Sequence, residues 1–342
     1  MSGGPAAPVP GFDPPRWLRG AHAQTIYASR FCPRPAVAYR RERWDTPDGD
    51  FIDVDRLAAD AQRADAPWLV LFHGLEGSSQ SHYARTLMHM AETLGWHGAV
   101  AHFRGCGGEP NRLARAYHSG DTAEVDWILR RFAACAGGAP LHVAGISLGG
   151  NVLMKWLGEQ GSAACAVVDT AISISAPVDL AAAGAALERG FARVYALSFL
   201  QTLKRKAMAK LLQSPGLFDA ARLGQARTMR AFDDVFTAPL HGYRDVDDYW
   251  MRASCKPGLG AVAVRSLMIN ALDDPFLPAS ALPGPSDVSP CVTLDYPAAG
   301  GHVGFVAGNP PGHARWLARR VAHFLGAPLE APCEQAARER VV

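Results

Sequence analysis

The 342-residue sequence predicts an α/β protein with a mostly parallel central sheet, helices on both faces and a helical cap inserted into the chain. Three observations lead to this prediction. Short apolar runs alternate with segments of helical spacing, which is the order of a parallel sheet. The alternation stops over residues 178–262, where helical spacing and aromatic residues dominate. The composition, 49% apolar and 19% charged, is that of an ordinary globular chain that can bury a large core.

The first half of the chain predicts a hairpin and three buried strands. Residues 39–57 read as two antiparallel strands joined at Pro47-Asp48-Gly49, which adds an antiparallel edge to the sheet. Short apolar runs predict the buried strands, and helical spacing predicts a helix after the first two of them. The strand segments are 68–74, 98–108 (with its loop) and 141–145, and the helical segments are 79–94 and 122–135.

The second half predicts the rest of the sheet and the inserted cap. Strands are expected over 166–177, 264–271 and 291–297, and helices over 148–160 and 313–326. We expect one domain spanning 1–342, with a flexible N-terminus at 1–15 and a solvated tail at 328–342. The helical insertion, 178–262, should cover the carboxyl edge of the sheet, where ligands bind in such folds.

Charge, cysteines and hydropathy exclude several classes of protein. A net charge of +2 gives no field that would recruit nucleic acid. The seven cysteines are scattered and form no C-x-x-C pair, so we expect neither a disulfide framework nor a metal site. The N-terminus lacks the pattern of a signal peptide, and no run of eighteen apolar residues predicts a transmembrane segment. We therefore expect a cytoplasmic protein; its oligomeric state is not predicted.

One serine has the sequence context of a nucleophile. Gly145-Ile146-Ser147-Leu148-Gly149 is a G-x-S-x-G motif between a predicted strand and a predicted helix. A tight strand-to-helix turn would hold Ser147 in an unfavourable backbone conformation and leave its hydroxyl exposed at the amino end of the helix. The motif is common by chance, and a plain turn is the alternative. Its place between strand and helix favours the nucleophile.

A serine nucleophile needs a base, and His302 is the predicted base. Enzymes built on this turn carry the acid and then the histidine further along the chain. His302 follows the last predicted strand on a glycine-rich loop, so it can reach over the sheet. The other downstream histidines lie in the insertion or on the terminal helix: His241, His313 and His323. A purely structural loop histidine is the alternative.

The acid that orients this histidine is predicted at Asp274 or Asp273. Both follow the strand 264–271. The pattern of a small residue, then aspartate, then proline fits Ala271, Asp274 and Pro278, which favours Asp274. The other aspartate would then cap the turn.

Two backbone N–H groups are predicted to form an oxyanion hole. One belongs to Leu148, directly after the nucleophile, and the other to Leu75 in the H-G-x-x-G stretch 73–77. His73 precedes the serine in the chain, and we expect it to anchor this loop by hydrogen bonding.

Several longer motifs identify a family. The chain resembles the YheT-like α/β-hydrolases, a group with type 4 esterase and lipase character that includes eukaryotic acylglycerol and phospholipid hydrolases. The resemblance implies a serine hydrolase of carboxylic esters with Ser147, Asp274 (or Asp273) and His302 as its triad. Some eukaryotic relatives carry an amino-terminal membrane anchor, which we do not expect in this chain. The motifs that carry the resemblance are GAHAQTIY (20–27), HGLEGSS (73–79), FRGCGGEPN (103–111), YHSGDTAEVDWIL (117–129), GISLGGNVLMKWLGE (145–159), FDDVFTAPLHGY (232–243), DYWMRAS (248–254), NALDDPF (270–276) and GGHVGF (300–305).

Three further features carry hypotheses of their own. Arg104, Glu109 and Asn111 form a buried polar network that shapes the site, or else a solvated loop. Cys106 has no local base, which argues against a reactive thiol. The amphipathic segment 191–212 is expected to be a cap helix, and peripheral membrane contact through its basic residues is the less favoured alternative. Those residues are Lys204, Arg205, Lys206 and Lys210.

The sequence therefore predicts a cofactor-free esterase that acts on a small-molecule ester with an apolar group through an acyl-enzyme intermediate. An acyltransferase or thioesterase would use the same triad. A binding or scaffold protein that kept the fold without catalysis is the alternative from another class.

Overall fold

The computed structural model describes residues 11–58, 63–327 and 329. Its centre is an eight-stranded sheet in the order β1-β2-β4-β3-β5-β6-β7-β8. The strands β1 and β2 form the predicted hairpin, β2 pairs antiparallel with β4, and all other pairs are parallel. The strands are β1 (Tyr39–Asp45), β2 (Phe51–Leu57), β3 (Trp68–Phe72), β4 (His97–Ala101), β5 (Leu141–Ile146), β6 (Thr170–Ile174), β7 (Arg265–Ile269) and β8 (Val292–Asp295).

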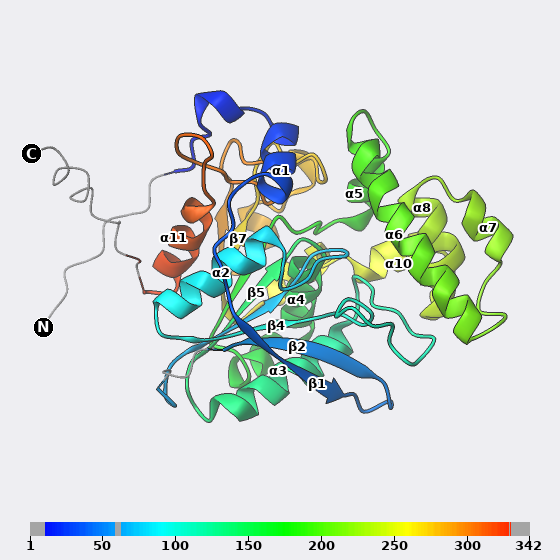
Figure 1. Cartoon of the computed structure of the whole chain (residues 1–342), viewed down its shortest axis with the longest axis horizontal. Helices are drawn as coiled ribbons and strands as arrows, with labels where there is room; N and C mark the ends of the chain where they lie inside the picture. The colour runs from blue at the N-terminus through cyan, green and yellow to red at the C-terminus, as the bar shows by residue number, and fades with distance from the viewer. Residues whose placement is uncertain (1–10, 59–62, 328, 330–342) are drawn as a thin grey trace, which may run out of the picture.

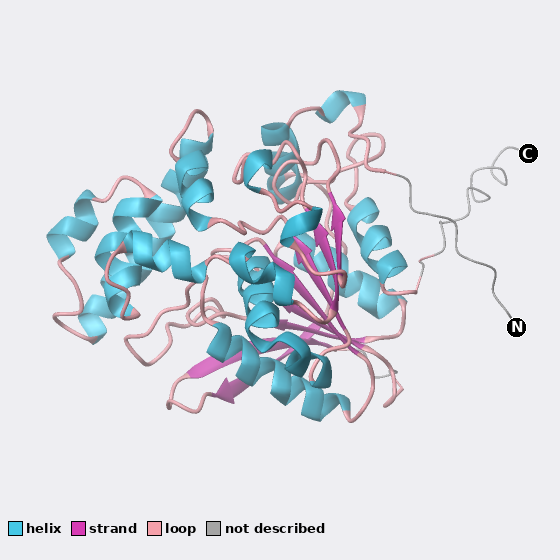
Figure 2. Cartoon of the chain, turned by 180° about the vertical axis from the view of Figure 1, so that it is seen from behind, coloured by secondary structure: helices cyan, strands magenta, loops and turns pink. Residues whose placement is uncertain are grey.

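Helices cover both faces of the sheet, as Figures 1 and 2 show. Successive side chains of a strand point to opposite faces, so each strand feeds two cores. Val70 and Phe72 pack with the helices α3 (Thr122–Ala136) and α4 (Leu148–Gln160) on one face. Leu69 and Leu71 pack on the other face, with α2 (His82–Thr93) and α11 (Arg315–Phe324). The fold class predicted from the sequence is confirmed.

The helical insertion, residues 178–262, lies between β6 and β7 and forms a lobe to the side of the sheet (Figures 1 and 2). It has an apolar cluster of its own, with Leu200, Leu223 and Phe236 among the buried members. Its helices are α5 (Leu180–Leu187), α6 (Ala192–Gln213), α7 (Ala220–Gln225), α8 (Met229–Phe232), the π-helical turn η3 (Asp233–Thr237), α9 (Ala238–Leu240) and α10 (Val246–Ala253).

The chain before the sheet forms a short helix, α1 (Ala21–Arg30), which packs near the loop after β8. Within the segment expected to be flexible, Phe12 is buried edge-on against Phe305 and Trp316. Residues 1–10 of that segment, and the predicted tail apart from residue 329, lie outside the described residues. Short 3-10 turns complete the fold at Arg16–Leu18, Gly161–Ala166, Lys256–Ala261, Ala279–Ala281 and Pro285–Asp287.

Candidate active site

Ser147 stands on a sharp turn between β5 and α4. Its φ is 53°, a backbone conformation that residues with a Cβ adopt only where the surrounding structure fixes it. The glycines around it permit the turn. A Cβ on Gly145 would collide with the Gly149 carbonyl, and a Cβ on Gly149 would collide with the Phe72 carbonyl. These close backbone approaches explain the glycines of the G-x-S-x-G motif.

The structure brings Ser147, His302 and Asp274 together in series. Ser147 Oγ lies 3.0 Å from His302 Nε2, and His302 Nδ1 lies 2.9 Å from Asp274 Oδ2 and 3.2 Å from Oδ1. A carboxylate only accepts, so Nδ1 carries the hydrogen and Nε2 is left to accept from the serine hydroxyl. The Asp274 side chain is 1% exposed and that of His302 is 11% exposed, which keeps water from most of this series.

Asp273, the alternative acid, has another partner. Its Oδ1 accepts a hydrogen bond of 2.8 Å from the Gly301 N–H, in the loop that carries His302. Burial, followed by the charge of Asp274, raises its pKa above the usual value. Of the two neighbouring carboxylates, Asp274 contacts the imidazole and Asp273 holds the loop.

Phe276 fixes the orientation of the His302 ring through one stacking contact and one backbone hydrogen bond. Phe276 stacks on the imidazole, with ring centroids 4.0 Å apart and an interplanar angle of 18°. The Phe276 N–H donates a 2.8 Å hydrogen bond to Asp274 Oδ1. Phe276 therefore orients both the His302 ring and the Asp274 carboxylate, a role that its place in the sequence does not predict.

The helix α1 clamps the loop of His302 from a distant part of the sequence. Thr25 Oγ1 accepts from the His302 N–H at 2.9 Å, and Gln24 Oε1 accepts from the Val306 N–H at 2.8 Å. Gln24 is fully buried. This stretch, GAHAQTIY (20–27), is one of the motifs that carry the family resemblance, but the sequence alone predicts no role for it. The only sequence feature that pointed to this contact is the pair of polar residues Gln24 and Thr25 in a short helix. Their function cannot be predicted until the loop that they bind is known.

The direction of the Leu75 N–H is set by hydrogen bonds to Gly74 O, the carbonyl oxygen of the same peptide group. Gly74 O accepts from His73 Nδ1 at 2.7 Å and from the Gly77 N–H at 2.9 Å. In a trans peptide the N–H points opposite to the C=O, so these two donors turn the Leu75 N–H the other way. Gly74 lies against Ser147, since a Cβ there would be 3.2 Å from Ser147 Cβ.

His73 anchors this loop in the neutral form. Its side chain is fully buried, and burial lowers its pKa to about 3. The Phe103 N–H donates to Nε2 at 3.1 Å, so the ring hydrogen lies on Nδ1 and donates to Gly74 O. The anchoring role expected for His73 is what the geometry gives.

The second predicted donor, the Leu148 N–H, belongs to the first residue of α4. An N–H in the first turn of a helix has no acceptor within the helix, and the helix dipole adds partial positive charge there. Both Leu75 and Leu148 line the cavity into which Ser147 and His302 open.

This cavity has a volume of about 940 Å³ and lies between the sheet and the helical insertion. The insertion lines it mainly with apolar and aromatic side chains, among them Leu180, Leu187, Tyr195, Phe199 and Trp250. Part of its polar lining lies in the loops after β3 and β4, with Glu76, Arg104, Asn111 and Tyr117, and Lys206 and Lys210 of α6 contact these loops.

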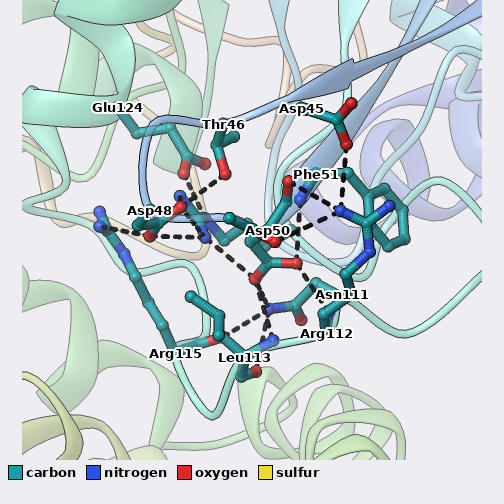
Figure 3. Close-up of polar contacts among 12 residues, drawn as sticks. Asp45, Thr46, Asp48, Asp50, Phe51, Asn111, Arg112, Leu113, Arg115 and Glu124 are labelled. Atoms are coloured by element: carbon teal, nitrogen blue, oxygen red, sulfur yellow. Dashed lines mark hydrogen bonds and ion pairs between the residues drawn. The ribbon is translucent and has the colours of Figure 1, made fainter.

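Figure 3 shows a buried polar network beneath the loop after β4. Asp50 is fully buried and accepts from Asn111 Nδ2 at 2.6 Å and from Arg104 Nη1 at 3.0 Å. Burial acts to raise the pKa of Asp50, but hydrogen bonds from Asn111 and from backbone N–H groups hold it below the usual value. Arg104 also pairs with Glu124. The network hypothesis is wrong for Glu109, whose exposed side chain pairs with Arg43 at the surface.

The basic residues of α6 do not form one outward surface. Lys206 Nζ donates to Glu76 Oε1 at 2.9 Å, and Lys210 Nζ donates to Asn111 Oδ1 at 2.6 Å. Lys204 Nζ donates to Gly224 O inside the insertion. The idea that these lysines jointly face a membrane is therefore wrong, because two of them are directed to the body of the protein.

Cys106 lies beside this cluster but is not an activated thiol. Burial raises its pKa to about 11, despite the Lys206 ammonium 3.4 Å from its sulfur. A protonated thiol is a poor nucleophile, so the structure agrees with the low reactivity expected for Cys106.

Two histidines outside the series, the buried His118 and the half-buried His241, form a pair between body and insertion. The ring centroids of His118 and His241 lie 4.2 Å apart, and among the described residues His241 Nε2 has no hydrogen-bond partner. Burial, followed by the neighbouring His118, lowers the pKa of His241 to about 3. Burial lowers that of His118 to about 4.

This pair predicts an acid-sensitive contribution to stability. The folded pKa of His241 lies below that of an unfolded histidine, about 6.5, so the unfolded chain takes up the proton first. The contribution is complete above that value and falls as pH decreases toward 3. When the pH is lowered from 7 to 5, the unfolding free energy of the wild type should fall by about 2 kcal/mol more than that of His241→Phe. Urea denaturation at the two pH values measures this difference. His323→Phe on α11 is the control, and equal losses in wild type and His241→Phe would contradict the expectation.

A strand-to-helix serine turn, an imidazole on the loop after the last strand and a carboxylate after the preceding strand define an α/β-hydrolase. The family model described as alpha/beta hydrolase fold matches residues 67–308. The chain belongs to this family, and within it to the YheT-like proteins. It is 41% identical over 322 residues to YheT of Escherichia coli (strain K12), provisionally named an esterase, with 94% of each chain covered.

Two further comparisons agree with this assignment. Phospholipase ABHD3 of Mus musculus is 30% identical over 327 residues, which cover 93% of this chain and 78% of that protein. The solved structure of the Pyrococcus furiosus esterase Pf2001 superposes with a TM-score of 0.52 at 16% identity, covering 93% of this chain and all of that one. At this identity the structural likeness shows the fold alone. The chain is therefore an α/β-hydrolase of the esterase and lipase type.

Within residues 11–58, 63–327 and 329, the helices are all too short or too polar to cross a membrane. In the same part of the chain, histidine, cysteine and carboxylate side chains are nowhere grouped as a metal site requires.

Proposed function

We propose that this protein is a serine hydrolase that cleaves short- to medium-chain or lipid-like carboxylic esters through an acyl-enzyme intermediate. One observation carries the proposal: the continuous hydrogen-bonded series from Ser147 Oγ through the His302 ring to the Asp274 carboxylate. A serine hydroxyl is a weak nucleophile at neutral pH, and this arrangement supplies the base and the group that orients it.

In the first half of the reaction, Ser147 Oγ attacks the ester carbonyl carbon while its proton moves to His302 Nε2. The developing oxyanion accepts hydrogen bonds from the Leu148 and Leu75 N–H groups, each of which is worth about 2.7–4 kcal/mol of barrier in comparable enzymes. The imidazolium is stabilised by Asp274 and gives its proton to the departing alcohol oxygen as the C–O bond breaks. The product of this half is an acyl-serine.

In the second half, a water molecule attacks the acyl-serine. His302 Nε2 takes a proton from the water, a second tetrahedral oxyanion forms, and the proton returns to Ser147 Oγ as the acid leaves. Every proton and bond in this cycle is accounted for by the protein, the ester and water. The proposed mechanism therefore uses no metal or organic cofactor.

The lining of the cavity supports an apolar ester. The helical insertion, which we propose acts as a cap, contributes aromatic and aliphatic side chains above the serine, including Tyr195 and Phe199. Relatives of this chain are named esterase, phospholipase and monoacylglycerol lipase, and these names support an ester substrate. Transfer of each CH₂ of an acyl chain from water into such a lining contributes about 0.8 kcal/mol.

Esters of increasing chain length test this proposal. We expect kcat/KM for p-nitrophenyl esters to rise from two to eight acyl carbons, by at most about fourfold per added CH₂. Phe199→Ala should flatten this rise, because Phe199 lines the cavity. The matched control on the same helix is Leu212→Ala, whose side chain is 85% exposed. A decline beyond four carbons would contradict an apolar acyl site.

Covalent labelling tests the chemistry itself. A fluorophosphonate should label the folded protein on the peptide that contains Ser147. Absence of label would favour a non-catalytic protein on this fold. Product analysis with added alcohols, or with thioesters, separates hydrolysis from acyl transfer and thioester cleavage, because acyl transfer would yield a new ester in place of the free acid.

A further inference from the structure

The turn that carries the Leu75 N–H contains an unusual residue. Gly74 O accepts from the Gly77 N–H, so Glu76 occupies the third position of a four-residue turn. Its φ is 55°, in the left-handed region where turns of this kind prefer glycine. A glutamate holds such a conformation only when its surroundings fix it. The contacts of Glu76 therefore need an explanation.

Tyr117 forms hydrogen bonds with both the backbone and the side chain of Glu76. Its hydroxyl accepts from the Glu76 N–H at 3.0 Å and donates to Glu76 Oε1 at 2.8 Å. The Glu76 side chain is 10% exposed. The peptide group on the C-terminal side of Leu75 is fixed by this pair of bonds, just as the group on its N-terminal side is fixed through Gly74 O.

The third contact of Glu76 comes from the helical insertion. Lys206 on α6 donates from Nζ to Glu76 Oε1 at 2.9 Å, across 130 positions of sequence. The carboxylate oxygen that holds Tyr117 is thus the same one that holds the lysine. Without the Lys206 ammonium, the Glu76 side chain could turn toward water, and its hydrogen bond with the Tyr117 hydroxyl would weaken.

We propose that Lys206 is a positioning residue for the oxyanion hole: through Glu76 it holds the turn that presents the Leu75 N–H to the tetrahedral intermediate. The inference rests on the proposed function, in which that N–H stabilises the oxyanion. It gives the insertion a second task besides lining the cavity. When α6 packs on the body of the protein, it both encloses the substrate and, through Lys206, positions the Leu75 N–H. Enclosure of the substrate and formation of the oxyanion hole are therefore coupled.

The test compares Lys206→Met with wild type, using p-nitrophenyl butyrate. We expect kcat to fall about tenfold, a fraction of the loss on removing an oxyanion donor outright, with KM within twofold. A trifluoromethyl ketone, which forms a tetrahedral oxyanion on Ser147, should bind about tenfold more weakly, whereas the parent methyl ketone should bind within twofold. Lys206→Arg should restore most of the loss. Lys204→Met is the control, because the hydrogen bond of Lys204 in the described part of the chain is to Gly224 O, inside the insertion.

Coupling through Glu76 has its own signature. Glu76→Gln should lower kcat by a similar factor, and the double variant with Lys206→Met should be no worse than either single one. In a Glu76→Gly background, Lys206→Met should have no further effect, because the tether is already absent. Glu76→Gln also serves if Lys206→Met fails to fold.

The outcomes separate this inference from the proposed function. An unchanged kcat in Lys206→Met and Glu76→Gln, or a rise in KM alone, overturns the positioning role while hydrolysis by Ser147 stands. Full hydrolysis by Ser147→Ala overturns the proposed function, and with it the inference.

Discussion

Ser147→Ala is expected to lower kcat for p-nitrophenyl butyrate by about 10⁶-fold and to abolish fluorophosphonate labelling. No other hydroxyl lies within hydrogen-bond distance of His302 Nε2 among the described residues. The methyl group of alanine cannot form the acyl-enzyme, so only the background from the oxyanion donors and binding should remain. The fold should persist, because alanine at this φ is no worse than serine.

The matched control is Ser198→Ala, a second serine that lines the cavity. It should retain activity within about threefold, with full labelling, since Ser198 is exposed on α6 and takes no part in the series. Comparable losses in both variants would mean that the cavity, and not Ser147 chemistry, had been disturbed. Melting temperatures measured alongside would identify such a disturbance.

Asp274→Asn is expected to lower kcat by about 10⁴-fold, the second largest effect. An amide NH₂ facing Nδ1 favours the tautomer with its hydrogen on Nε2, which can no longer accept the serine proton. The amide oxygen left at the position of Oδ1 can still accept from the Phe276 N–H, so the stacked ring keeps its anchor and the expected loss comes from the tautomer.

Its neighbour offers a matched control of the same chemical type. Asp273→Asn should cost less than about tenfold in kcat, because its amide oxygen can still accept from the Gly301 N–H. Kinetics of both variants at pH 7 and 8, with unfolding curves, measure the difference. Equal losses would contradict the assignment of Asp274 as the orienting carboxylate.

The parts of the fold that could be predicted from sequence are those governed by local patterns. Buried parallel strands are continuous apolar runs, and β3, β5 and β6 are of this kind, with every residue buried. The serine turn was predictable from its local G-x-S-x-G motif, and the collision that excludes a Cβ at Gly145 is local, with Gly149, whereas the collision at Gly149 is with Phe72 of β3. The choice of Asp274 over Asp273 was a preference from spacing, and the contact with His302 follows it.

The contacts that could not be predicted join distant segments. Thr25 meets the His302 loop, Lys206 meets Glu76 and Lys210 meets Asn111 only once the insertion and α1 are placed on the sheet. Glu109 shows the converse error. Arg104 and Asn111 of the same motif are buried, but the side chain of Glu109 ends at the surface beside Arg43. A run of polar letters does not say which of them face inward.

The clamp between α1 and the histidine loop has a consequence for biosynthesis. Thr25 emerges from the ribosome early, but its partner at His302 follows 277 residues later. Nascent chains that end before this loop can form most of the sheet, yet they hold Ser147 without the imidazole that the proposed mechanism requires. We expect the contact between Ser147 and His302 to be among the last parts of the molecule to assemble, so that incomplete chains do not hydrolyse esters by this mechanism.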